Sequence, residues 1–197
     1  MAGEMKKDWN TVDSDRRLVL GVAGSARKQG NSATLLEVVL NELRAEFRTE
    51  TVFLVDCRIE PCQGCHYCEQ HGSCKIGDDM PRLWQEMLRA DVVILAAPSY
   101  MGGLTSRMQA FMERTWPLRK GRLAGKVGGY IVVGRRRIGM ATGIMEEYFT
   151  RLGMLKLPGV VGYAFEPGQI AKDEEAMRQS RGLAGGVRRA LGLADRT

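Results

Sequence analysis

The sequence predicts a single α/β domain built around a doubly wound parallel sheet of five strands. Short apolar runs alternate with segments whose apolar residues recur at helical spacing, which is typical of parallel strands joined by helical crossovers. The runs are almost continuously apolar, as expected where helices cover both faces of a sheet. The 197 residues can bury one substantial core, and a content of 44% hydrophobic and 26% charged residues is ordinary for a globular domain.

Five apolar runs predict the strands: Leu18 to Ala23, Thr51 to Val55, Val92 to Ala97, Tyr130 to Val133 and Val160 to Phe165. Pro98 directly follows the third run and is expected to end that strand, because proline cannot donate a ladder hydrogen bond.

Amphipathic segments predict the helices: Leu35 to Leu43, Met80 to Leu88, Met108 to Met112, Ala141 to Leu152 and a stretch within Ile170 to Leu191. We expect Asn31 or Ser32 to cap the first helix and Thr105 or Ser106 to cap the third. Gly153 is expected to close the fourth helix, and glycines are expected to weaken the last one.

The expected strand order is 2-1-3-4-5, the order of flavodoxin. Sheets of this kind bind ligands outside the carboxyl ends of the strands, at the point where the strand order reverses. That point lies between strands one and three, and the loops after these two strands are the richest in glycine and polar residues.

The loop after the first strand predicts a phosphate site formed by Ser25, Arg27, Gly30, Asn31 and Ser32. Its glycines let backbone N–H groups turn toward an anion, its hydroxyl and amide groups can donate hydrogen bonds, and the following helix presents its positive end. The loop is neither a Walker A motif nor a Gly-x-Gly-x-x-Gly fingerprint. By itself it also fits a simple capped turn, and its position at the switch point favours phosphate.

The loop after the third strand predicts a platform for a flat ring, formed by Pro98, Ser99, Tyr100, Met101, Gly102 and Gly103. Backbone amides beside the two glycines can meet the polar edge of a heterocycle. The tyrosine and the methionine can supply the apolar contact that an aromatic ring needs. A plain glycine-rich turn is the alternative interpretation.

Four cysteines crowd the segment between the second strand and the second helix, where Cys62, Cys65, Cys68 and Cys74 form a Cys-x2-Cys-x2-Cys-x5-Cys run. Thiolates this close can bind one metal centre together, and a cubane iron–sulfur cluster needs four of them. Zinc, a redox disulfide and metal-free thiols are the alternatives. Cys57 is expected to be a small buried residue.

These motifs together carry a family resemblance. Gly24-Ser25-x-Arg27 with Asn31-Ser32, and Pro98-x-Tyr100-x-Gly102 followed by Met108-x-x-Phe111-Met112-x-Arg114, resemble the NAD(P)H-dependent FMN reductase group of flavodoxin-like proteins. With the cysteine run between them, the chain is similar to the iron–sulfur flavoproteins of that group.

The resemblance implies that the first loop binds the FMN phosphate and the third-strand loop binds the isoalloxazine ring. A glycine-rich loop after the fourth strand completes the flavin site in this group, which adds Gly134 and Arg135 as candidates. Here that loop contains three consecutive arginines and departs from the family pattern. The resemblance also implies a [4Fe-4S] cluster on the four cysteines and a homodimer or homotetramer.

We therefore expect an FMN-dependent oxidoreductase that passes electrons between a [4Fe-4S] cluster and FMN, with no catalytic side chain because the flavin does the chemistry. The expected partners are a ferredoxin-like donor or NAD(P)H and a small-molecule acceptor. A cluster-free NAD(P)H-dependent FMN or quinone reductase is one alternative, and a non-enzymatic thiol or metal redox sensor is another.

The organisation of the chain completes these expectations. Residues 1–16 are predicted to form a flexible arm, and residues 17–197 one domain with a cysteine-rich loop over 57–76. No apolar run is long enough to span a membrane and no signal-peptide core is visible, so we expect a cytoplasmic protein.

Net charge is +6, yet no nucleic-acid-binding signature is present, and we expect no nucleic-acid partner. The basic stretch from Arg135 to Arg137, at the carboxyl end of the fourth strand, suits a nucleotide phosphate, an acidic protein partner or a solvated loop.

Overall fold

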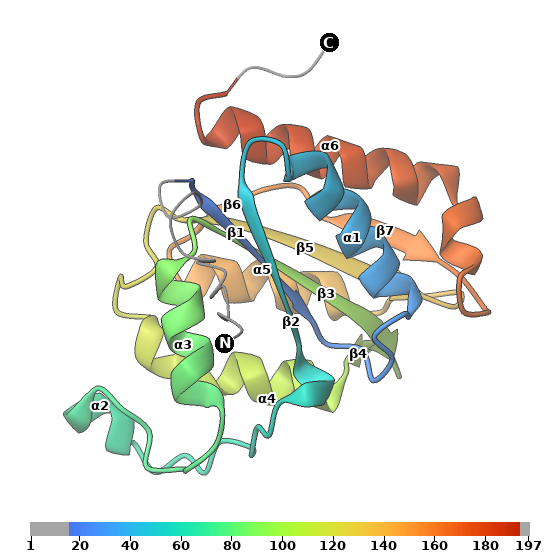
Figure 1. Ribbon diagram of the computed structural model, residues 1–197. Coiled ribbons are helices and arrows are strands. Elements are labelled where there is room, and N and C mark those ends of the chain that lie inside the picture. Colours follow the sequence, from blue (N-terminus) through green and yellow to red (C-terminus); the bar gives the residue numbers. More distant parts are fainter. Residues whose placement is uncertain (1–15, 194–197) are drawn as a thin grey trace, which may run out of the picture.

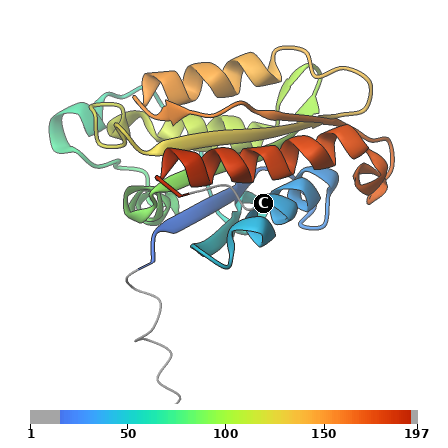
Figure 2. The same cartoon turned by 90° about the horizontal axis from the view of Figure 1, so that it is seen from above.

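A computed structural model describes residues 16–193 of the chain, so the arm predicted over residues 1–16 lies outside the described residues apart from Arg16. A twisted sheet forms the middle layer, with helices on both faces (Figures 1 and 2). Its main strands are β1 (Leu18–Ala23), β2 (Arg48–Phe53), β3 (Val92–Tyr100), β5 (Val127–Gly134) and β7 (Val160–Tyr163).

The main strands are parallel and lie in the order β2-β1-β3-β5, with β7 pairing with the far side of β5. This arrangement confirms the predicted flavodoxin-like order. Two short strands were not predicted. β6 (Leu155–Lys156) pairs with the start of β5, and β4 (Gly103–Leu104) folds back antiparallel onto the end of β3.

The helices are α1 (Asn31–Leu43), α2 (Tyr67–His71), α3 (Met80–Arg89), α4 (Ser106–Arg114), α5 (Ala141–Arg151) and α6 (Glu174–Ala190). Three short 3-10 turns span Leu54–Asp56, Trp116–Leu118 and Gln169–Lys172. α1 and α6 pack in the hydrophobic cluster on one face of the sheet, and α3, α4 and α5 pack in the cluster on the other face. No helix within residues 16–193 has the length and apolarity needed to cross a bilayer.

The prediction that Pro98 ends the third strand is wrong, because β3 continues to Tyr100. β1 pairs with β3 only as far as Ala96, whereas β5 pairs with it through Pro98 and Val133. Pro98 therefore lies beyond the end of β1, where one side of β3 has become an edge that tolerates a missing N–H group.

The last helix is also stronger than expected, since α6 runs without a break across its three glycines. Its buried face, which includes Leu183, Ala184 and Val187, packs against the core. Tertiary packing of this face outweighs the poor helix propensity of glycine.

Candidate functional site

The carboxyl ends of β1, β3, β5 and β7 surround a pocket of about 340 Å³. The lining residues are Ser25, Arg27, Gly30, Asn31, Ser32, Pro98, Ser99, Tyr100, Val133, Gly134, Arg135, Ala164, Phe165, Glu166 and Pro167. All the predicted residues of the first loop line this pocket, as do Gly134 and Arg135. The loop after β3 contributes only its first part, because Met101, Gly102 and Gly103 are not among the lining residues.

The start of α1 has the features of a phosphate site. Ser32 is 2% exposed, and its Oγ has no hydrogen-bond partner among the described residues. Ser25 Oγ accepts a hydrogen bond from the backbone N of Arg27 at 3.1 Å, which leaves its own hydroxyl proton available to donate. The first bond of the helix joins Thr34 N to Gly30 O at 3.0 Å, so the preceding N–H groups of the first turn remain available for an anion.

Gly30 leaves the space at the start of α1 open for a phosphate. A Cβ at this position would lie 3.0 Å from Ser25 Oγ and 3.1 Å from Arg27 O. Gly30 is also the residue before the helix, so the expectation that Asn31 or Ser32 caps the helix through its side chain is wrong. A buried hydroxyl without a partner, beside a helix N-terminus and an arginine, fits the phosphate of FMN.

The Asn31 side chain has another role. Its Nδ2 donates to Glu166 O at 2.9 Å, and its Oδ1 accepts from Gly168 N at 2.9 Å. The amide therefore fastens the loop after β7 to the first turn of α1. Any contact of Asn31 with a phosphate is expected to come from its backbone N–H group.

The loops after β3 and β5 are held together at the other end of the pocket. Met140 N donates to Gly102 O at 2.7 Å, and Ser99 Oγ donates to Ile138 O at 3.0 Å. Gly139 has φ +57°, and a Cβ on it would lie 2.4 Å from Gly102 O. The close approach of the two loops thus requires glycine at this position.

The side chains of the loop after β3, residues 98–103 and here called the ring loop, differ in how they face the pocket. Tyr100 lines it and is 49% exposed. Met101 is fully exposed with φ 50°, and Gly103 pairs with Tyr100 in the β3–β4 hairpin. Tyr100 is thus the large side chain of this loop that can contact a flat ring in the pocket.

Sequence reasoning missed the loop after β7, which adds Ala164, Phe165, Glu166 and Pro167 to the pocket. Phe165 is partly exposed, and the guanidinium of Arg135 lies 5.9 Å from its ring centroid. The signal was the turn-forming Pro-Gly pair that follows the fifth predicted strand after one residue, at the same carboxyl edge as the other loops.

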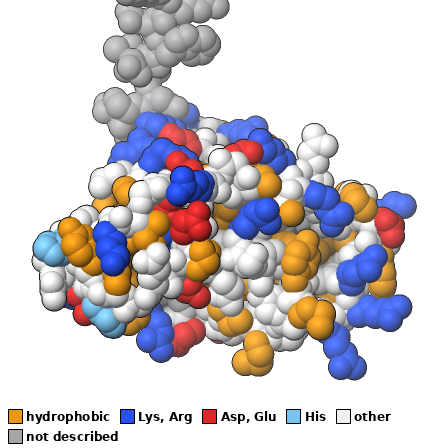
Figure 3. Space-filling view, turned by 90° about the horizontal axis from the view of Figure 1, so that it is seen from below, with side chains coloured by type: hydrophobic (Ala, Val, Ile, Leu, Met, Phe, Trp, Pro, Cys, Tyr) orange, Lys and Arg blue, Asp and Glu red, His pale blue; other side chains and the backbone are white. Residues whose placement is uncertain are grey.

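The cysteine loop leaves the sheet after β2 and carries the short helix α2. Cys62 and Cys65 are exposed, Cys68 and Cys74 are partly buried, and none of them is in a disulfide. Burial raises the pKa of the Cys68 thiol, and the neighbouring charge of Cys74 raises it further. The histidines of the chain belong to this loop and lie toward one end of the face shown in Figure 3, and many basic side chains lie toward the other end.

Part of the cysteine set shares one cavity. Cys62 and Cys68 line a pocket of about 260 Å³ together with Gly64, His66, Glu113 and Trp116. Within residues 16–193, no three His, Cys, Asp or Glu side chains are close enough together to hold a metal ion. Four thiols are nevertheless the ligand set that a [4Fe-4S] cluster requires, so the residues present fit the cluster in their chemistry.

The α2 helix within this loop is docked onto the turn after α4. Glu69 accepts hydrogen bonds from Trp116 Nε1 at 3.1 Å and from Arg119 Nη2 at 2.7 Å. These hydrogen bonds lower the pKa of the Glu69 carboxyl. Trp116 thus connects the tip of the cysteine loop to the body of the domain.

A pocket at the switch point of a flavodoxin-like sheet, beside a helix N-terminus and an arginine, is typical of proteins that bind flavin nucleotides. The comparisons with known proteins agree with this class. Residues 18–166 match the NADPH-dependent FMN reductase model, and the chain belongs to that family.

Two relatives carry the name of the group that the loops and the cysteine run resemble. The chain is 33% identical over 178 residues to an iron–sulfur flavoprotein of Methanocaldococcus jannaschii, covering 84% of this chain and 92% of that protein. It is 34% identical over 166 residues to an iron–sulfur flavoprotein of Archaeoglobus fulgidus, covering 82% and 75% respectively.

A solved structure supports the fold. The Trp repressor binding protein from Bacillus subtilis superimposes with a TM-score of 0.64 at 23% identity, covering 84% of this chain and 99% of that one. Together, the comparisons confirm the predicted fold, the family and a flavin-dependent oxidoreductase that uses FMN. The family also indicates a nicotinamide partner.

Proposed function

We propose that this FMN-dependent oxidoreductase binds FMN in the pocket at the carboxyl edge of the sheet and carries a [4Fe-4S] cluster on Cys62, Cys65, Cys68 and Cys74. Electrons enter one at a time from a ferredoxin-like donor or as hydride from NAD(P)H, and leave to a small-molecule acceptor. The buried, unpartnered hydroxyl of Ser32 at the start of α1 is the single observation that carries the flavin assignment.

In this proposal the residues of the chain bind and orient rather than exchange protons. Ser25 and Ser32 donate hydrogen bonds to the phosphate, Arg27 neutralises it, and the first turn of α1 adds its free N–H groups. Tyr100 and Phe165 contact the ring system. When bound, FMN supplies both hydride and single-electron chemistry, which a side chain cannot.

The cluster assignment is supported by the ligand set and by the names of the relatives. Cys62 and Cys68 already line one cavity. A bound cluster would supply one-electron chemistry at the edge of the domain.

A second candidate is the cluster-free NAD(P)H-dependent FMN or quinone reductase. It is favoured by one observation, that no three ligating side chains converge within residues 16–193. Both candidates use the same flavin pocket, so they differ only in the state of the cysteine loop.

We also propose a homodimer or homotetramer in the cytoplasm. Tyr100, Met101 and Met140 expose apolar side chains beside the pocket, as a contact surface for a second copy would.

The test is anaerobic purification followed by visible spectroscopy and assays of FMN, iron and acid-labile sulfide. The proposal predicts one FMN per chain and four iron and four sulfide ions per chain. FMN without iron and sulfide, combined with steady oxidation of NAD(P)H, would establish the cluster-free reductase instead. Ferredoxin-dependent reduction of the bound flavin would separate the two electron donors.

A further inference from the structure

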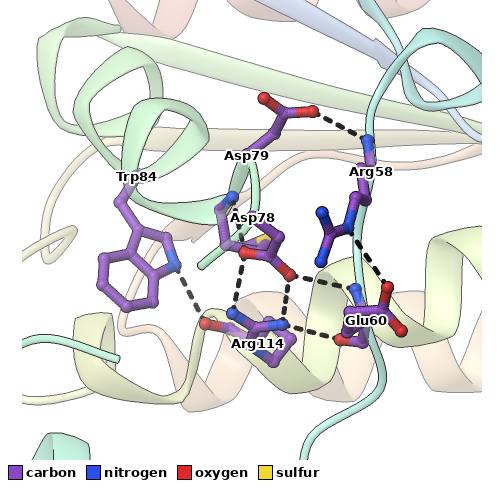
Figure 4. A network of polar contacts seen from close by, with 7 residues as sticks. Arg58, Glu60, Asp78, Asp79, Trp84 and Arg114 are labelled. Carbon is purple, nitrogen blue, oxygen red and sulfur yellow. Dashed lines mark hydrogen bonds and ion pairs between the residues drawn. The ribbon is translucent and has the colours of Figure 1, made fainter. Parts of the chain in front are cut away.

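Arg114, the last residue of α4, carries a buried positive charge beside the cysteine loop. Its side chain is 1% exposed, and that of its partner Asp78 is 0% exposed. Two parallel bonds join them, from Nη1 to Oδ2 at 2.6 Å and from Nη2 to Oδ1 at 3.0 Å (Figure 4). This forked geometry fixes the direction of both side chains, which a lysine could not reproduce.

The same guanidinium joins the two ends of the cysteine loop. Nη1 also donates to Glu60 O at 2.7 Å, and Asp78 Oδ2 accepts from Glu60 N at 3.0 Å (Figure 4). Glu60 precedes Cys62 by two positions, and Asp78 follows Cys74 by four. The loop therefore leaves and re-enters the domain at Arg114.

Neighbouring contacts make this junction rigid. Asp79 Oδ2 accepts from Arg58 N at 2.7 Å, and Asp79 N donates to Arg58 O at 3.0 Å. Trp84 Nε1 donates to Arg114 O at 2.9 Å, which ties α3 to the end of α4. Loop ends held by this many hydrogen bonds, among them the buried pair of Arg114 and Asp78, have little freedom to separate.

The other end of α4 is joined to the loops that line the flavin pocket. Thr105, the N-cap residue, accepts from Met108 N and donates through Oγ1 to Gly24 O at 2.7 Å. Gly24 begins the phosphate loop, and Thr105 follows the ring loop. A nine-residue helix is about 14 Å long, so α4 sets a short, fixed span between the pocket and the cysteine loop.

Cys74 is the cysteine of the run that precedes Asp78 by four positions. It is partly buried and packs against the hydrophobic cluster on the α4 face of the sheet. Burial acts to lower the pKa of Arg114, but Asp78 and, to a smaller degree, Cys74 raise it above the usual value. Arg114 Nε is buried without a hydrogen-bond partner among the described residues, so it remains available to a sulfur.

We propose that Arg114 is a positioning residue, which holds Cys74 and both ends of the cysteine loop at a fixed distance from the flavin pocket. One consequence rests on the proposed function: a cluster bound by the four thiols would stay at a constant distance from FMN.

The test uses a neutral replacement of the pair, Asp78→Asn with Arg114→Met, because removing one partner alone would leave an uncompensated buried charge. Arg114→Lys is the conservative variant, which keeps the charge and loses the fork. Arg151→Met is the matched control, since Arg151 pairs with Glu147 on the exposed surface of α5.

The first readout needs no cluster. In FMN-loaded, metal-free protein, alkylation of each cysteine by iodoacetamide is followed by mass spectrometry. We expect Cys74 to react about tenfold faster in the neutral-pair variant, as local opening becomes easier by about 1.4 kcal/mol. The exposed Cys65 serves as the internal reference and should not change, and FMN affinity should stay within about twofold.

The second readout is iron and sulfide content after anaerobic reconstitution, with the cluster potential from a redox titration. We expect the neutral-pair variant to lose most of its iron and sulfide, Arg114→Lys to retain them at a shifted potential, and Arg151→Met to match the wild type. If the wild type itself takes up no cluster, the proposed function fails while the alkylation result still decides the role of Arg114. An unchanged Cys74 rate in both Arg114 variants would overturn the inference.

Discussion

Replacing Ser32 with alanine should have opposite effects on the free protein and on its FMN complex. The Oγ atom is buried and has no partner in residues 16–193, and an unsatisfied buried hydroxyl costs about 1–3 kcal/mol. Ser32→Ala should therefore stabilise the flavin-free protein by an amount in this range. Each kcal/mol corresponds to a rise of about 2–4 °C in Tm for a domain of this size.

The same change should weaken FMN binding. A hydrogen bond to a charged acceptor is worth about 1.5–3 kcal/mol, so the Kd for FMN should rise about 10- to 150-fold. Riboflavin has no phosphate, and its Kd should not change. Fluorescence titration with the two flavins and thermal denaturation of the flavin-free protein measure all three effects.

Ser180→Ala provides the matched control, because Ser180 is also fully buried but its Oγ donates to Ala176 O at 2.8 Å within α6. This variant should bind FMN as the wild type does. The reasoning is refuted if Ser32→Ala binds FMN with unchanged affinity, or if it weakens riboflavin and FMN equally.

Three other perturbations test separate parts of the account. Gly139→Ala should lower the free energy of unfolding by more than about 2 kcal/mol in denaturant titrations, because φ is positive and the new Cβ would meet Gly102 O at 2.4 Å; a stability equal to that of the wild type would contradict the observed contact between these loops. Arg27→Gln should raise the Kd for FMN by about tenfold at low salt and less at high salt, since the lost interaction is largely electrostatic; a salt-independent effect would argue against a phosphate contact. Burial acts to raise the pKa of Asp78, but the hydrogen bonds from Arg114, Glu60 N and Met80 N together outweigh it and hold that pKa below the ordinary value of 3.8. The ion pair therefore stabilises the protein above pH 3.8 and its contribution is lost as the pH falls through the lowered pKa, so acid unfolding of the wild type below pH 3.8 should be steeper than that of the Asp78→Asn, Arg114→Met variant.

The main strands and helices could be predicted because apolar runs and helical periods are local signals. Their order in the sheet could be predicted from the rules for α/β folds, once strands and helices were seen to alternate. Strand ends were harder to predict, as β2 shows. The second strand was expected over Thr51 to Val55, but β2 runs from Arg48 to Phe53 and is followed by the 3-10 turn Leu54–Asp56. β2 is an edge strand with a half-exposed face, so its polar first residues carry no apolar signal.

Within the site, local motifs located the pocket but not the partners of each side chain. Ser25 and Ser32 could be identified from the loop and the helix start alone. The bonds of Asn31 to the loop after β7 span more than 130 residues, and no local pattern predicts them. The pairing of Arg114 with Asp78 is equally non-local, because 36 positions separate the two residues.

Calorimetric titration of the flavin-free protein with FMN and then with riboflavin tests the central claim most directly. Two or more charge-assisted bonds to the phosphate imply that FMN binds once per chain and at least about 100-fold more tightly than riboflavin. Equal affinities for the two compounds, or no heat of binding with either at about 100 μM ligand, would contradict a pocket built around the start of α1.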